Sequence, residues 1–90
     1  MIPESFEDEL AFLSTIAEDS ISKVLLSPDR TSKHKPYSWR KEDTNQHLLK
    51  VARHINTYMQ IEAGYQKDDG EKHLYNALTR LVMALGKMED

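Results

Sequence analysis

Apolar residues recur at steps of three and four along three stretches of this chain, a spacing that places side chains on one face of an α-helix. The longest such stripe, in residues 71–88, comprises Leu74, Ala77, Leu78, Leu81, Val82, Leu85 and Met88. The chain has 90 residues, which is enough for one domain with one small core. We therefore expect a single all-α domain over residues 1–90.

The first helix is predicted for about residues 5–26. Ser5 and Asp8, three positions apart, resemble a capping box, and Pro28 disfavours helical backbone at the residue before it. The apolar face of this helix would comprise Leu10, Leu13, Ala17, Ile21 and Val24. Residues 27–42, which follow, are predicted to form a long basic loop.

Two further helices are predicted, over about residues 43–63 and 71–88. Asp43 and Gln46 can cap the start of the second helix. Its inner stripe would comprise Leu48, Ala52, Ile55 and Met59. Because the link to the third helix is short, we expect the second and third helices to form an antiparallel hairpin.

The wide apolar arc of the third helix predicts a homo-oligomer, formed through the first or the third helix. A three-helix monomer of this size buries only about 60–65% of its unfolded surface and is marginally stable. The first helix would then pack on the hairpin of its own chain or on a partner subunit. In the competing explanation, the first helix alone covers the hairpin.

Composition excludes several classes of protein. The chain has no Cys, which rules out a disulfide scaffold, a thiol nucleophile and a Cys-based zinc site. No run approaches the roughly 20 apolar residues that a membrane span needs. No signal peptide opens the sequence. We expect a soluble cytoplasmic protein, located in the host cell cytoplasm if a phage encodes it, with no membrane partner.

Charge is distributed unevenly along the chain, whose formal net charge is −3. Residues 1–22 carry six acids and no Lys or Arg, whereas residues 30–41 carry five bases, His34 and no acid. A duplex binder spreads many cations over a wide face, so five bases on an acidic chain suit a small anion better than nucleic acid. Alternatively, both runs are solvated surface.

The segment around the only Trp interleaves cations with aromatic rings. A nucleotide base can stack on Trp39 or Tyr37 while Lys35, Arg40 and Lys41 neutralise phosphate. Alternatively, Trp39 fills the small core, as a single Trp commonly does. Both hypotheses hold if Trp39 fixes the segment and the bases face outward.

A second polar group falls on the predicted hairpin. Arg53, His54, Asn76 and Arg80 can form one seam that holds phosphate oxygens, and His54 and His73 can add hydrogen bonds to a ligand. The alternative is a solvated flank of the hairpin.

A metal site is the next option. His54, His73, Asp68 and Asp69 have suitable ligand chemistry, but their spacing matches no strong metal motif. Helical pyrophosphatases hold magnesium with carboxylates clustered on their helices, and this chain has no such cluster there. We therefore assign no metal ligand, no catalytic residue and no cofactor.

Several short motifs lie together in residues 33–85. They are Lys35-Pro36-Tyr37-Ser38-Trp39-Arg40-Lys41, His47-Leu48, Arg53-His54, Asp69-Gly70-Glu71-Lys72-His73-Leu74 and Asn76-Ala77-Leu78. They resemble the small phage domain known as the N-terminal part of dATP/dGTP diphosphohydrolases. This chain departs from that family at Gly70-Glu71, where the family has Ser-Gly, and at Asn76, where a second His is expected.

The resemblance implies a phage protein with a purine-nucleotide ligand. Size and predicted helical architecture are also similar to those of phage proteins that sequester nucleotide signals of bacterial immunity. The favoured hypothesis is therefore an anti-defence protein that sequesters a nucleotide or cyclic nucleotide without turnover. The expected ligand-binding residues are Lys35, Tyr37, Trp39, Arg40, Lys41, Arg53, His54 and His73.

Two alternatives remain. One is a magnesium- or manganese-dependent dATP/dGTP diphosphohydrolase, with His54, Asp69, Glu71 and His73 near the metal. The other is a helical interaction module that docks on a partner protein through the stripe of the third helix.

Overall fold

The computed structural model describes residues 5–89, and every regular element in that range is helical. The elements are α1 (Phe6–Leu25), α2 (Pro28–Lys33), the short 3-10 helix η1 (Ser38–Lys41), α3 (Thr44–Glu62) and α4 (His73–Glu89). The all-α fold class is thus confirmed. None of these described helices combines the length and the apolar character that crossing a membrane requires.

Side-chain caps fix where the long helices start. The Ser5 hydroxyl accepts a hydrogen bond from the backbone N–H of Asp8 at 3.1 Å. At α3, the Asp43 carboxylate accepts from the Gln46 N–H at 2.8 Å while the Gln46 amide oxygen accepts from the Asp43 N–H at 2.7 Å. Each cap satisfies backbone donors that the first turn of a helix leaves without partners.

The prediction that residues 27–42 form a loop is wrong, because α2 and η1 lie within them. Pro28 begins a helix instead of merely ending the one before it. Its fixed φ and missing N–H suit the first helical position, and Ser27 provides the cap by accepting from the Arg30 N–H at 3.3 Å. The expected three helices are therefore four helices and a 3-10 turn.

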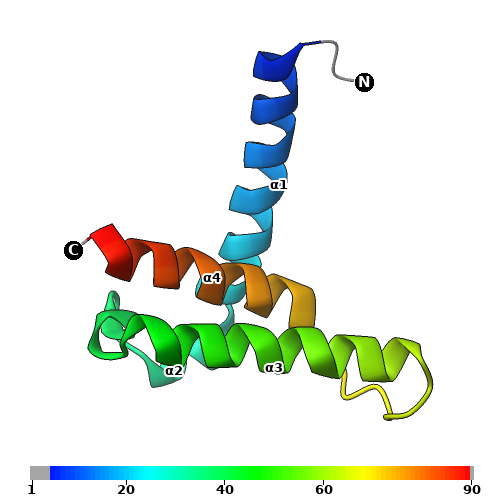
Figure 1. Ribbon diagram of the computed structural model, residues 1–90. Coiled ribbons are helices and arrows are strands. Elements are labelled where there is room, and N and C mark those ends of the chain that lie inside the picture. The colour runs from blue at the N-terminus through cyan, green and yellow to red at the C-terminus, as the bar shows by residue number, and fades with distance from the viewer. Residues whose placement is uncertain (1–4, 90) are drawn as a thin grey trace.

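Helices α3 and α4 lie side by side and antiparallel, and α1 stands across them (Figure 1). The C-terminal part of α1 packs against α4, so this helix does contact the hairpin of its own chain. The N-terminal half of α1 projects away from the hairpin.

The interior of the hairpin is polar, and the predicted inner stripe of α3 is wrong. Leu48, Ala52, Ile55 and Met59 are all exposed, while α3 turns His47 and His54 toward the interior. His54 forms a hydrogen bond with His73 of α4, and His47 forms one with Arg80 of α4. The apolar side chains of the predicted stripe could not form these bonds. Among the described residues, the buried hydrophobic side chains are Ala77, Met83 and Ala84 alone.

Trp39 is half-buried and joins η1 to the hairpin. Its indole ring packs edge-on against His47, with 6.2 Å between ring centroids, and its carbonyl accepts from Nε2 of His47 at 2.8 Å. The same ring lies over Gly86 of α4, where an added Cβ would be 3.0 Å from Trp39 Cη2. Trp39 thus anchors the basic segment against the hairpin.

Enlarging Gly86 tests this anchor. We expect Gly86→Leu to displace the indole ring and to lower the free energy of unfolding by about 1–3 kcal/mol, the usual cost of overpacking. Because Trp39 is the only Trp, its emission should shift to longer wavelength as the ring becomes more exposed. An unchanged spectrum and melting temperature would contradict this placement of the ring.

Candidate functional site

Two adjoining pockets of about 450 and 410 Å³ form one groove between the hairpin and the α1–α2 segment. They share Arg30, His34, Lys50 and Arg80. We call the two pockets together the cationic groove. Nine of the twelve Lys and Arg residues line it, namely Lys23, Arg30, Lys33, Lys35, Lys41, Lys50, Arg53, Lys72 and Arg80.

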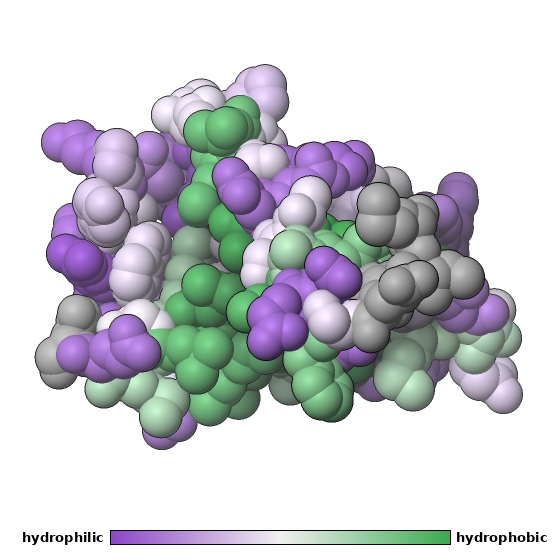
Figure 2. All heavy atoms as spheres, turned by 90° about the horizontal axis from the view of Figure 1, so that it is seen from above, coloured by the Kyte–Doolittle hydropathy of each residue, from purple (hydrophilic) through white to green (hydrophobic). Residues whose placement is uncertain are grey.

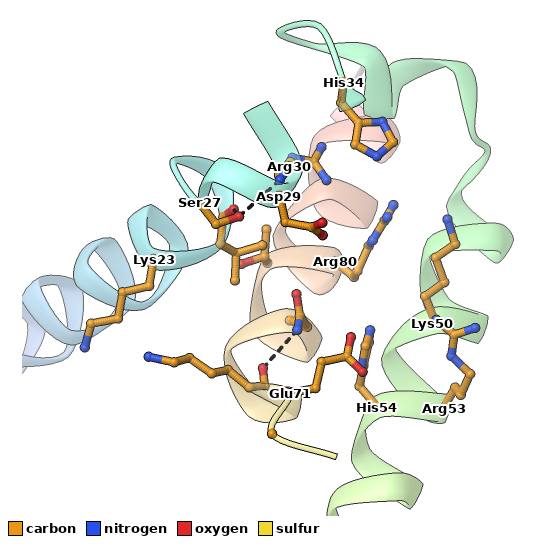
Figure 3. Close-up of a pocket in the computed structure, with 15 residues that line it drawn as sticks. Lys23, Ser27, Asp29, Arg30, His34, Lys50, Arg53, His54, Glu71 and Arg80 are labelled. Carbon is orange, nitrogen blue, oxygen red and sulfur yellow. Dashed lines mark hydrogen bonds between the residues drawn. The ribbon is translucent and has the colours of Figure 1, made fainter. Parts of the chain in front are cut away.

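The cations reach the first pocket from different elements (Figure 3). Lys50 and Arg53 extend from α3 on one side, and Arg80 lies on α4 between them and Arg30 of α2. The pKa of Arg30 is lowered from its usual value, first by burial and then by the charge of Arg80. Such mutual repulsion is relieved when an anion enters.

Glu42 ties two of these cations together. Its carboxylate accepts from Nη1 of Arg80 at 2.6 Å and also pairs with the ammonium of Lys50. Nη1 of Arg80 also donates to Nδ1 of His47, which is fully buried, at 3.2 Å. The hydrogen bond from Lys50 is the main reason that the pKa of Glu42 is lowered. The pairs with Lys50 and Arg80 hold both cations at the groove wall.

A second polar chain, Asp69–His73–His54, runs from the α3–α4 link to the groove. Nε2 of His73 lies 3.0 and 2.9 Å from the two carboxylate oxygens of Asp69, and Nδ1 of His73 lies 2.9 Å from Nδ1 of His54. Both imidazoles are buried. Hydrogen bonds from the Glu71 N–H and then from His73 lower the pKa of Asp69.

The hydrogen bonds from Asp69 through His73 to His54 couple the proton positions on the two imidazoles. A carboxylate only accepts, so Nε2 of His73 donates to Asp69. Burial is the main cause that lowers the pKa of His54, which favours its neutral form. One of the two Nδ1 atoms must donate its hydrogen to the other, so the tautomers of His54 and His73 are coupled. Because His54 lines the first pocket, its ring can form a hydrogen bond with a bound molecule.

Asp69, Glu71 and His73 also form a possible cation site. One ligand atom from each of the three lies within 4.8 Å of the others. Two carboxylates and one imidazole are a donor set that divalent transition metals accept, and His73 would ligate through Nε2 only after that atom loses the hydrogen it donates to Asp69. The sequence hypothesis placed His54, Asp69, Glu71 and His73 near a metal and stays a prediction. Three of the four lie together here, whereas His54 hydrogen-bonds to His73 instead.

The structure divides the predicted ligand-binding residues among several places. Lys35, Trp39 and Lys41 line the second pocket, whereas Arg53 and His54 line the first. The predicted seam of Arg53, His54, Asn76 and Arg80 lies along the first pocket, as all four line it.

The other three predicted residues lie at the periphery of the groove or beneath it. Tyr37 lines a separate pocket of about 490 Å³ together with Trp39. Arg40 places its guanidinium 4.6 Å from the centroid of the Tyr37 ring and 5.5 Å from the Trp39 ring. His73 is buried, hydrogen-bonds to His54 and does not line the groove.

Sequence reasoning missed the roles of Arg30, Glu42 and Lys50. Arg30 belongs to the predicted basic run, but its place in the groove depends on helix α2, which was not predicted. Lys50 falls on the polar flank of α3 at helical spacing from His47 and His54, which is the signal that was available. Glu42 pairs with Arg80, which lies 38 positions later in the sequence, so no local sequence pattern could predict that contact.

No protein-family model, curated protein or solved structure matches this chain. The resemblance to the diphosphohydrolase family thus stays a prediction.

Proposed function

We propose that the cationic groove binds a phosphate-bearing small molecule, a nucleotide or cyclic nucleotide, and sequesters it. The observation that carries this proposal is the collection of nine of twelve basic residues in one groove of a chain whose net charge is −3. The acidic residues lining the groove are Asp29, Glu42 and Glu71, so positive charges outnumber negative ones there. Such an excess in a cleft of an acidic protein is expected where an anion binds.

The size of the groove favours a small molecule. Each pocket falls within the range of about 300–1,000 Å³ that is typical of ligand sites. Arg53 and Arg80 supply guanidinium groups that can bind phosphate oxygens in pairs, and Lys50 adds a point charge on the same wall. A long nucleic acid would extend beyond the groove over a chain whose net charge repels it.

Aromatic residues near the second pocket support a nucleotide over inorganic phosphate. Trp39 lines this pocket and also the neighbouring one, where Tyr37 lies. A base can stack on either ring while its phosphates reach Lys35 and Lys41. His54, which lines the first pocket, can then form a hydrogen bond with a sugar hydroxyl.

Thermal-shift measurements with nucleosides, nucleotides of increasing phosphate number and cyclic nucleotides test this proposal. Binding to the native state raises the melting temperature through mass action. We expect a shift that grows with the number of phosphates and is absent with the nucleoside, and we expect the recovered ligand to be intact. No shift with any phosphate compound would refute the proposal.

A second candidate function is a metal-dependent nucleotide diphosphohydrolase, favoured by the cluster of Asp69, Glu71 and His73. A magnesium or manganese ion held there would polarise a phosphate oxygen or a water molecule. This candidate predicts release of pyrophosphate from dATP or dGTP only when metal is present. It also predicts that Asp69→Asn abolishes release, whereas Asp68→Asn, at the adjacent position, preserves it.

A further inference from the structure

The hairpin exposes a continuous apolar stripe. On α3 it consists of Leu48, Ala52, Ile55 and Met59, and on α4 of Leu74, Leu78, Leu81, Leu85 and Met88. We call these nine residues the hairpin stripe. Its large side chains, with the exception of half-buried Leu78, are 41–70% exposed. Viewed from above, hydrophobic side chains gather in a band across the molecule and along the edge that faces the viewer in Figure 1 (Figure 2).

Helical geometry places the two halves of the hairpin stripe on one face. Residues two positions apart on a helix point about 160° apart. Ile55 is therefore nearly opposite Arg53 on α3, and Leu81 is nearly opposite Thr79 on α4. Because Arg53 and Thr79 both line the first pocket, Ile55 and Leu81 share the face that points away from the groove.

The spacing of the hairpin stripe is that of helices that pack on other helices. Its members follow one another at steps of four and three, in the order 4-3-4 on α3 and 4-3-4-3 on α4. This is the heptad spacing of coiled coils and four-helix bundles, in which each apolar residue inserts between residues of the facing helix.

We infer that a second copy of this chain covers the hairpin stripe, so that two hairpins form a four-helix bundle. A twofold interface brings the same patch of both subunits together, which like charges would oppose. The hairpin stripe contains no charged residue. The hairpin stripes of two copies can therefore face each other without charge repulsion, and their spacing allows the side chains of one to insert between those of the other.

The chain exposes more surface than a compact monomer does, in part because the N-terminal half of α1 projects away from the hairpin. Its accessible surface is 7180 Å², whereas a compact monomer of 10.4 kDa exposes about 5,400 Å². Its radius of gyration is 14.9 Å, against about 12 Å for a compact chain of this length. The exposed side chains of the hairpin stripe amount to roughly 600–700 Å², close to the about 800 Å² that each partner buries in a standard interface.

Dimerisation through this face leaves the cationic groove open on the opposite face. The inference therefore does not rest on nucleotide binding, and each subunit would present its own groove. Failure of one proposal leaves the other intact.

Sedimentation velocity with the full chain tests the inference. At tens of micromolar we expect a mass of about 21 kDa, twice that of the chain. Leu81→Glu should shift the population toward monomer by at least tenfold in dissociation constant. The matched control is Leu49→Glu, because Leu49 also lies on α3 and is 71% exposed but borders Lys50 and Arg53 on the other side. This control should remain dimeric.

Cross-linking keeps the test decisive if Leu81→Glu does not fold. The chain has no Cys, so Ala52→Cys introduces a single thiol into the hairpin stripe and Leu49→Cys introduces one outside it. A short bismaleimide should link Ala52→Cys into covalent dimers at least tenfold faster than Leu49→Cys. A wild-type monomer that melts cooperatively, or equal cross-linking of the two variants, would overturn the inference.

Discussion

Arg53→Ala is expected to weaken binding of a nucleoside triphosphate about 10- to 100-fold, because a charge-assisted hydrogen bond contributes about 1.5–3 kcal/mol. Arg53 lines the first pocket and is exposed, so its loss should leave the melting temperature of the free protein nearly unchanged. Isothermal titration calorimetry at fixed ionic strength measures the change.

Lys67→Ala is the matched control for Arg53→Ala. Lys67 lies in the exposed link between α3 and α4, and it does not line the cationic groove. Both variants remove one positive charge, so a general electrostatic effect would weaken binding equally in the two. Equal affinities for these variants would show that phosphate is not held at Arg53.

Glu42→Gln is expected to lower the free energy of unfolding by about 2 kcal/mol, because Arg80 and Lys50 lose their shared carboxylate. Losing the pair with Arg80 should cost more than losing the pair with Lys50, because the Arg80 side chain is only 17% exposed and its charge would be left without this partner. Chemical unfolding at fixed protein concentration measures the difference. Glu62→Gln, at the exposed end of α3 and outside the ion pairs of the described residues, should have no comparable effect.

The same variant has a predictable pH dependence. The pKa of Glu42 is lowered in the folded state, so the ionised carboxylate contributes its full stability above the ordinary carboxyl pKa of 4.5. That contribution is lost as the pH falls from there through the lowered pKa. The difference between wild type and Glu42→Gln should therefore be constant near pH 7 and shrink in acid. A difference that grows in acid would contradict the pairing.

Local signals in the sequence predict where the helices start but not how they face one another. Ser5 and Asp43 cap α1 and α3 because caps depend on residues three positions apart. The apolar stripe of α3 was assigned to the interior, since an isolated chain has no other place to bury it. Its exposure follows from contacts distant in sequence, in which His47 and His54 pair with residues of α4.

The residues of the candidate site could likewise be predicted only where a local sequence pattern marks them. Arg53 and His54 carry a recognisable polar pattern, and both line the groove. The contribution of Arg30 depends on the unpredicted helix α2, and the role of Glu42 depends on a partner 38 positions away. The sequence thus predicts some of the residues that line the groove, and only the tertiary arrangement shows which cations converge there.

Equilibrium dialysis of the wild-type protein against a labelled nucleoside triphosphate, without added metal, tests the central claim most directly. Our account predicts saturable binding that is competed by other phosphate compounds but not by the nucleoside, with the ligand recovered unchanged. Binding that is absent, or that the nucleoside competes as well as the triphosphate does, would contradict the assignment of the cationic groove as a phosphate site.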